Sequence, residues 1–451
     1  MSKAPRWLPS IIFTLLGLAA ALILFPMENR LVAEYLSNFP DSHLSTTQAR
    51  PYILLVLCFM PAIASWAYCF GNVFDRYVSR QFLGIFLICL GSLFTLWMLL
   101  DLHDNLGDFS GIENKFASVT GFYILRSPAI LLVLLPYSLL LANIYCLGKL
   151  SKSNEIIAMI QSGTGILRLT LPLIFAGCWC SVLLMGLNYH WAPHADGRRE
   201  EMIAIAQGRP IIQAKNVLFR APNSERLWMV ERFPEKFLSG DPLQNVEITT
   251  TNPDRSIKTR TQSSSASYNK SNRTWTLHNP LISRFEAGQA PVFEQLTEPV
   301  VYKDWAETPS QIIKPGLSVE YLGIPELKSW LISPLAKQMT ANLPAYLTQW
   351  HYRWALPLTC LVTVLLAVPL SIHFSRRGGG SGIFLAVVLS VMMLFISSIT
   401  LALGESGSVM PMLAAWLPNI IFAVIGLYLY HRRVTGRSIH QSIKNLLNFN
   451  H

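Results

Sequence analysis

The sequence predicts an α-helical membrane protein with one inserted all-β domain, and two observations lead to this prediction. Of the 451 residues, 51% are hydrophobic and only 14% are charged, and the mean hydropathy is +0.37. Soluble domains are about one quarter charged, so this chain is too apolar to be one. The second observation is the order of segments. Eight apolar runs are near the length that crosses a bilayer, and a long polar region separates the fifth from the sixth.

The first two apolar runs, residues 8–25 and 51–71, predict a transmembrane hairpin. Lys3 and Arg6 precede the first run, as they would in a secretory signal peptide. The run is longer than the apolar core of such a peptide, and no small-residue cleavage site follows it. We therefore expect it to be retained as a helix. The other predicted spans are residues 83–100, 128–147, 167–187, 355–372, 383–403 and 413–430.

Two polar segments flank the third span. Residues 74–82, FDRYVSRQF, place aromatic side chains on one side and Arg76 and Arg80 on the other. This pattern predicts a helix that lies in the cytoplasmic interface and then turns into the span. Residues 101–109, DLHDNLGDF, follow the span and hold His103 between carboxylates. They suit a proton or metal site or, more simply, a solvated helix end, and we favour the helix end.

A short polar turn between the fourth and fifth spans, residues 149–163, contains one amphipathic helical segment. Ser151 or Ser153 can cap its N-terminus, and Glu155 falls in its first turn, where the helix dipole favours a carboxylate. Gly163 can end it. Three apolar residues recur at helical spacing and share one face, namely Ile156, Met159 and Ile160.

The pattern changes in residues 191–316. Short alternating segments such as NVLFRA, RLWMVERF and QNVEITTT are separated by turn residues, without helical periodicity. Six or more such strands predict a β-sandwich or jelly roll. A connecting helix is then predicted at residues 322–335. The chain thus divides into five parts: the hairpin (1–72), an interfacial helix, three spans and the amphipathic turn (73–190), the jelly roll (191–316), the connecting helix (317–346), and three spans with a basic tail (347–451).

Basic residues concentrate at alternate ends of the predicted spans. The positive-inside rule assigns such ends to the cytoplasm. Both termini and the turn at residues 149–163 are therefore expected inside, and the β domain outside. The residues on the cytoplasmic side are Lys3, Arg6, Arg76, Arg80, Lys149, Lys152, Arg376, Arg377, Arg432, Arg433 and Arg437.

Several other functions lack support in the sequence. A net charge of +10 suits nucleic-acid binding, but the basic residues lie beside spans, where topology explains them. All seven cysteines fall in apolar runs and predict buried side chains, with neither disulfides nor a metal site. His190, His194 and His351 are interpreted as scattered, without metal-ligand spacing. The HExxH and GxSxG motifs of hydrolases do not occur.

Five motifs occur in one order along the chain: FDRYVSRQF, LGKLSKSNEIIAMIQSG, NYHWAPHADGRREEM, QWHYRWALPLTCLVTVLLAVPLS and GESGSVMPMLAAWLPNIIF. With them, the chain from residue 74 onward resembles the YjgP/YjgQ permease family, the LptF and LptG subunits of the lipopolysaccharide exporter. The family has six helices, so residues 1–72 look like an added hairpin. Ile160 departs from the family, because members often carry Arg at this position.

The resemblance implies a permease subunit of an ABC transporter that extracts lipopolysaccharide from the inner membrane and passes it to a periplasmic bridge. Its implied partners are a cytoplasmic ABC ATPase dimer (LptB-like), a second permease subunit of the family, and LptC/LptA-like periplasmic jelly-roll proteins. The chain would be no enzyme and would hold no cofactor, because the partner subunit would bind ATP. The residues implied to couple it to the ATPase are Glu155, Asn154, Ile156, Met159 and Gly163.

Two other functions stay open from the sequence. One is a membrane-embedded enzyme that modifies an envelope glycolipid, and the other is an ABC-type permease that releases a different lipid or a lipoprotein.

Overall fold

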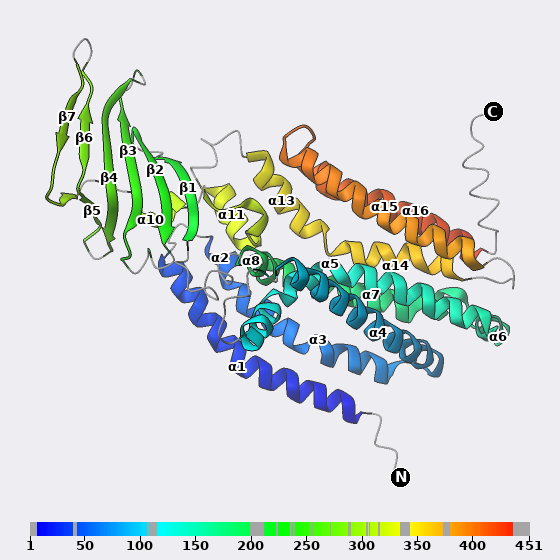
Figure 1. Cartoon of the computed structure of the whole chain (residues 1–451). Coiled ribbons are helices and arrows are strands. Elements are labelled where there is room, and N and C mark those ends of the chain that lie inside the picture. The colour runs from blue at the N-terminus through cyan, green and yellow to red at the C-terminus, as the bar shows by residue number, and fades with distance from the viewer. Residues whose placement is uncertain are drawn as a thin grey trace, which may run out of the picture.

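The computed structural model describes residues 7–38, 43–105, 107, 115–198, 212–221, 224–234, 237, 240–252, 254, 256–270, 272–286, 290–303, 305, 307–313, 316–333, 343–372 and 379–435. Its helices form an elongated bundle, and a β-sheet stands at one end of this bundle (Figure 1). The short helix α6 lies at the other end (Figure 1). These are called the sheet end and the α6 end.

Long apolar helices make up the bundle. They are α1 (Leu8–Asn38), α3 (Arg50–Phe70), α4 (Val73–Asp104), α5 (Lys115–Lys152), α7 (Ile166–Tyr189), α15 (Gly379–Glu405) and α16 (Pro411–Val434). The shorter helices are α2 (Leu44–Gln48), α6 (Glu155–Gln161), α8 (Trp191–Gly197), α10 (Pro309–Ile313), η3 (Val319–Tyr321), α11 (Ile324–Ile332), α13 (Leu343–Ala355) and α14 (Leu358–Ser371). Among the described residues, seven helices are long and apolar enough to cross a membrane, or eight if the bent pair α13–α14 is one span.

The sixth predicted span, residues 355–372, corresponds to α14, and a bend of 51° at its start separates it from α13. Pro357 accounts for the break, since its ring nitrogen cannot donate to the carbonyl of Arg353 one turn earlier. The side chain of Asn188 donates to that carbonyl instead, at 2.7 Å. Asn419 donates to the carbonyl of Ala355, also at 2.7 Å. Both buried backbone oxygens are thus satisfied, as the interior of a membrane requires.

The first two long helices form the predicted hairpin. Helix α1 extends well past its predicted end, and its Glu28 makes a buried ion pair with Arg50 of α3 at 2.6 Å. At the tip of the hairpin, the backbone amide of His43 donates to the hydroxyl of Ser329 in α11 at 2.8 Å. The hydroxyl of Tyr189 donates to a carbonyl of α2 at 2.8 Å. The tip of the hairpin therefore contacts both α7, which precedes the β domain, and α11, which follows it.

The expected interfacial helix does not turn into the third span, and this prediction was wrong. Both belong to the continuous helix α4. A capping box begins it, in which the Asn72 side chain accepts from the backbone and the Asp75 carboxylate accepts from the Asn72 amide. The sequence from Asn72 to the end of α4 contains no proline, so nothing interrupts the helix.

The inserted domain is an antiparallel sheet of eight strands among the described residues: β1 (Ile212–Arg220), β2 (Arg226–Pro234), β3 (Leu243–Thr251), β4 (Ile257–Asn269), β5 (Thr274–His278), β6 (Leu281–Arg284), β7 (Val292–Gln295) and β8 (Val300–Tyr302). The strand order is β1-β2-β3-β4-β5-β8, and β6 pairs with β4 and β7. The long strand β4 pairs through its N-terminal half with β6 and through its C-terminal half with β5. The predicted all-β insertion is confirmed.

Aromatic side chains fill the core of the sheet. Trp228 and Trp275 are fully buried, with ring centroids 4.8 Å apart. Trp305, which follows the last strand, packs edge-on against Trp228 at 5.2 Å. The adjacent Glu307 accepts two hydrogen bonds from Arg226 at 3.0 and 3.1 Å. These contacts join the segment that follows β8 to β2.

Candidate functional site

The predicted coupling segment is a helix of seven residues, α6, between the ends of α5 and α7. Asn154 is its N-cap residue and adopts a left-handed conformation, with φ of 61° and no hydrogen bond from its side chain to the helix. The prediction that Ser151 or Ser153 caps α6 was wrong. The Ser153 hydroxyl donates instead to the carboxylate of Glu155 at 2.8 Å.

Glu155 is held at the surface by two hydroxyl groups from different parts of the chain. Besides Ser153, the Tyr77 hydroxyl on α4 donates to its other carboxylate oxygen at 2.7 Å. Tyr77 is itself exposed, with 38% of its surface accessible. The carboxylate is therefore oriented by α4 while it stays open to a partner on the outer side of α6.

Gly163 ends α6, as the sequence predicts. Its φ of +86° lies in the left-handed region that favours glycine. The Gly163 amide donates to the carbonyl of Ile160 at 3.0 Å, and the Thr164 amide donates to that of Met159 at 3.1 Å. This pair of bonds is a Schellman motif, which satisfies the last carbonyls of a helix.

The apolar face of α6 points into the bundle. Ile156 is 0% exposed and Met159 is 8% exposed. Both belong to one core cluster with side chains of α4, α5 and α7, including Val78, Phe82, Leu147, Leu150, Leu169 and Leu173. The two residues therefore anchor α6 in the apolar core that these helices share. The face that remains open to a partner carries Asn154, Ala158, Gln161, Ser162 and Gly163.

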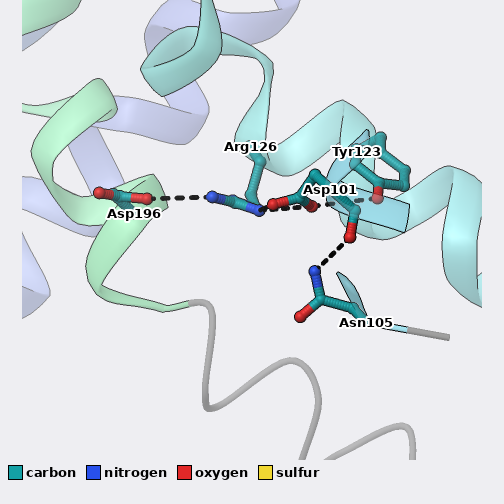
Figure 2. A network of polar contacts seen from close by, with 5 residues as sticks. All are labelled: Asp101, Asn105, Tyr123, Arg126 and Asp196. Atoms are coloured by element: carbon teal, nitrogen blue, oxygen red, sulfur yellow. Dashed lines mark hydrogen bonds and ion pairs between the residues drawn. The ribbon is translucent and has the colours of Figure 1, made fainter. Parts of the chain in front are cut away.

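A polar network at the sheet end joins three helices (Figure 2). Arg126 of α5 donates to both carboxylate oxygens of Asp101 of α4, at 3.0 and 2.9 Å, and to Asp196 of α8 at 3.3 Å. The Tyr123 hydroxyl donates to Asp101 at 3.0 Å. Asp101 is therefore not part of a solvated helix end. His103 is exposed, as expected of such an end.

A second cluster lies beside this network and corrects the interpretation of His190 and His194 as scattered residues. Helix α8 brings them together, and Glu326 of α11 joins them. The Glu326 Oε1 atom lies 3.0 Å from His190 Nδ1 and 3.3 Å from His194 Nε2. The three ligand atoms lie within 4.8 Å of one another, so this is a possible metal-binding group. His351 is not a member of this group.

Burial sets the protonation of the cluster. Burial and the charge of His194 lower the pKa of His190 to about 3, so its ring is neutral at pH 7. Burial alone would raise the pKa of the Glu326 carboxyl, but the two histidines outweigh it and hold that pKa well below its usual range.

Comparison with known protein families decides which kind of protein this is. The family model described as lipopolysaccharide export system permease LptF/LptG matches residues 76–432, which is more than half of the chain. The chain belongs to the LptF/LptG family. The match begins within α4 and ends within α16, so it includes α6, the β domain and the His190 cluster but leaves out the α1–α3 hairpin. A search of curated proteins gave no significant match.

The family confirms the predicted membrane permease of lipopolysaccharide transport, with its inserted β domain. Sequence reasoning missed the two clusters at the sheet end. The spacing of four between His190 and His194 was visible as a signal, since it places two side chains on one helix face. Glu326 gave no signal, because the whole β domain separates it from the histidines.

Proposed function

We propose that the chain is the permease subunit of an ATP-driven exporter that extracts lipopolysaccharide from the inner membrane and passes it to a periplasmic bridge. In this proposal, both termini and the α6 end are cytoplasmic, and the sheet end is periplasmic. ATP is hydrolysed by an LptB-like ATPase dimer, because this chain has no phosphate-binding loop of its own. Family membership and the construction of α6 support the proposal.

An external energy source follows from the chemistry of the cargo. A lipid with several acyl chains exposes roughly 60 methylenes when it leaves the bilayer, which costs on the order of 50 kcal/mol if they meet water, at about 0.8 kcal/mol each. The exporter therefore needs both a continuous apolar path and force delivered from the ATPase. A helix that receives this force must be anchored firmly to the spans that move.

The observation that carries the proposal is the two-sided construction of α6. Its inner face is anchored by Ile156 and Met159 among α4, α5 and α7. Its outer face is polar and presents the carboxylate of Glu155, held by Tyr77 and Ser153. A partner that binds the outer face can therefore displace three transmembrane helices through α6. In this proposal, Ile156 and Met159 contribute to coupling by anchoring α6 and do not contact the ATPase themselves.

Two transmembrane helices are suited to meet the lipid and the second permease subunit. Helices α4 and α15 leave most of their apolar side chains uncovered within the chain, whereas α5 is largely buried; α1 and α3 are similarly uncovered but lie outside the family match. We assign the lateral gate to these two helices. Their exposed side chains include Leu83, Leu87, Leu96, Leu99, Phe384, Val391 and Phe395.

The sheet offers an edge for a periplasmic partner. Strand β7 pairs only with β6 among the described strands, and all four of its residues are exposed. Val292 and Phe293 are 61% and 66% exposed. An unpaired edge with apolar side chains can accept a strand from another sheet. An LptC/LptA-like protein would bind there and extend the sheet into the bridge.

The change Glu155→Arg tests the proposal. It reverses the charge on the outer face of α6 without touching the anchored face, so the chain should insert normally but recover much less ATPase on purification from native membranes. Glu298→Arg is the matched control, because Glu298 is exposed in the β domain at the opposite end of the molecule. Equal recovery of the ATPase with both variants would contradict the assignment.

A further inference from the structure

The cluster of His190, His194 and Glu326 gathers three possible metal ligands around one buried carboxylate. Within the described part of the chain, His190 Nδ1, His194 Nε2 and both carboxylate oxygens of Glu326 are buried without a hydrogen-bond partner. This holds although both nitrogens lie within 3.3 Å of Glu326 Oε1. The contacts are close enough for ion pairs, and one metal ion shared by the three side chains would bind all of these atoms together. Atoms that approach one another in this way are arranged like ligands around a shared centre.

The two distances from the Glu326 oxygen fit a tetrahedral ion. Nitrogen and oxygen ligands bonded to zinc at about 2.0–2.1 Å in a tetrahedron lie roughly 3.3 Å from each other. The Glu326 oxygen lies 3.0 Å from one histidine nitrogen and 3.3 Å from the other. Two imidazoles and one carboxylate are also ligands that suit a divalent transition metal better than calcium or magnesium.

Local backbone features bring these ligands together. His190 ends α7, and the amide of His194 donates to its carbonyl at 3.3 Å, so both histidines project from one turn. Gly323 begins α11 at this point. A Cβ atom on Gly323 would lie 2.6 Å from the carbonyl oxygen of Tyr189 and 2.8 Å from the Glu326 carboxylate. Glycine therefore allows α11 to approach α7 closely enough for Glu326 to reach the histidines.

The positive charges near the cluster have partners of their own. Arg50, which acts on His190, is paired with a carboxylate of α1 at 2.6 Å, and Arg353, which acts on Glu326, donates to the side chain of Asn188 and to a backbone carbonyl of η3. The side chains of Glu326 and His190 are only 7% and 13% exposed, but that of His194 is 33% exposed. The site is thus enclosed on the side of α11, and the outer part of the His194 ring reaches the surface while its Nε2 atom is buried.

We propose that His190 Nδ1, His194 Nε2 and the Glu326 carboxylate bind one divalent transition metal ion, with zinc as the best fit. The ion joins α8, which leads toward β1, to α11, which follows the last strand. It therefore clamps the two connections of the β domain to each other at the sheet end. Trp191 follows the first histidine, where the HExxH motif places its general base, so the site is a structural clamp and not a hydrolytic centre.

Metal analysis of the full chain tests this inference independently of lipid export. The chain is purified in nanodiscs with a tag that contains no histidine, loaded with zinc or cobalt(II), washed and analysed for metal content and for the visible spectrum of tetrahedral cobalt. We expect one ion per chain. His194→Ala and Glu326→Gln should each weaken binding at least about tenfold, because the loss of a partner that only orients a ligand already costs that much. His103→Ala is the control, because His103 is an exposed histidine outside the cluster.

Thermal unfolding guards against variants that bind no metal because they fail to fold. Without added metal, His194→Ala should melt close to the parent chain, since its side chain is partly exposed. Added zinc should raise the melting temperature of the parent and of His103→Ala, but not that of His194→Ala. The same metal content and the same shift in all three proteins would show adventitious binding only and overturn the inference.

Discussion

Replacing Ile156 by alanine tests whether α6 is anchored by its inner face. Ile156 is 0% exposed, and the substitution removes three carbon atoms from the core cluster. Their transfer is worth roughly 0.8 kcal/mol per carbon, and the cavity left behind brings the cost to about 2–5 kcal/mol. A helix of seven residues is too short to persist alone, so this loss falls directly on its docking. At about 1.4 kcal/mol per factor of ten, α6 should detach roughly 30 to several thousand times more often.

Hydrogen exchange measured by mass spectrometry on the chain in nanodiscs reports this detachment. The informative amides are those that bond within α6 and at its end, such as Ser162 to Ala158 and Thr164 to Met159. In Ile156→Ala, these amides should exchange faster by up to the factor by which α6 detaches more often, roughly 30 to several thousand. Ala158→Ser is the matched control, because Ala158 is exposed on the same helix. If both variants exchange at the same rate, the inner face does not hold α6 and the reasoning fails.

Two further predictions concern the sheet end. A cysteine in place of the exposed Ser264 should react with a membrane-impermeant maleimide added from the periplasmic side, whereas labelling from the cytoplasm alone would reverse the proposed topology. Arg126→Met should destabilise the packing of α4 on α5 by about 3–5 kcal/mol, because it leaves Asp101 partly buried without its cation. The double variant Arg126→Met with Asp101→Asn should recover much of the lost thermal stability. If the double variant loses the sum of the two single losses, the two side chains do not interact.

Local rules predicted much of α6 from the sequence. The position of Glu155 in the first turn and the ending at Gly163 follow from dipole and C-cap preferences that depend on a few neighbouring residues. The cap was misassigned because Asn154 enters the left-handed region, which asparagine tolerates, and this displaces the serines. Periodicity found the apolar face of Ile156 and Met159 but not its direction, which only the packing of α4, α5 and α7 determines.

The membrane helices and the inserted strands were also predictable, because hydropathy and alternation are properties of short segments. The break at Pro357 was a local signal that the apolar run concealed. The clusters around Arg126 and Glu326 were beyond sequence reasoning. Arg126 meets Asp101 and Asp196 only through the packing of three helices, and Glu326 meets the histidines only through the packing of segments that lie on either side of the β domain in the sequence.

The central claim is that a separate ATP-hydrolysing protein acts on this permease through the outer face of α6. A photo-crosslinking amino acid at Ala158, in cells that contain the native envelope, tests it most directly. The same amino acid at Ser264 in the β domain is the control. The account predicts a covalent adduct between the Ala158 variant and an ATP-binding protein, with none from Ser264. An Ala158 variant that is inserted and folded but forms no such adduct would contradict it.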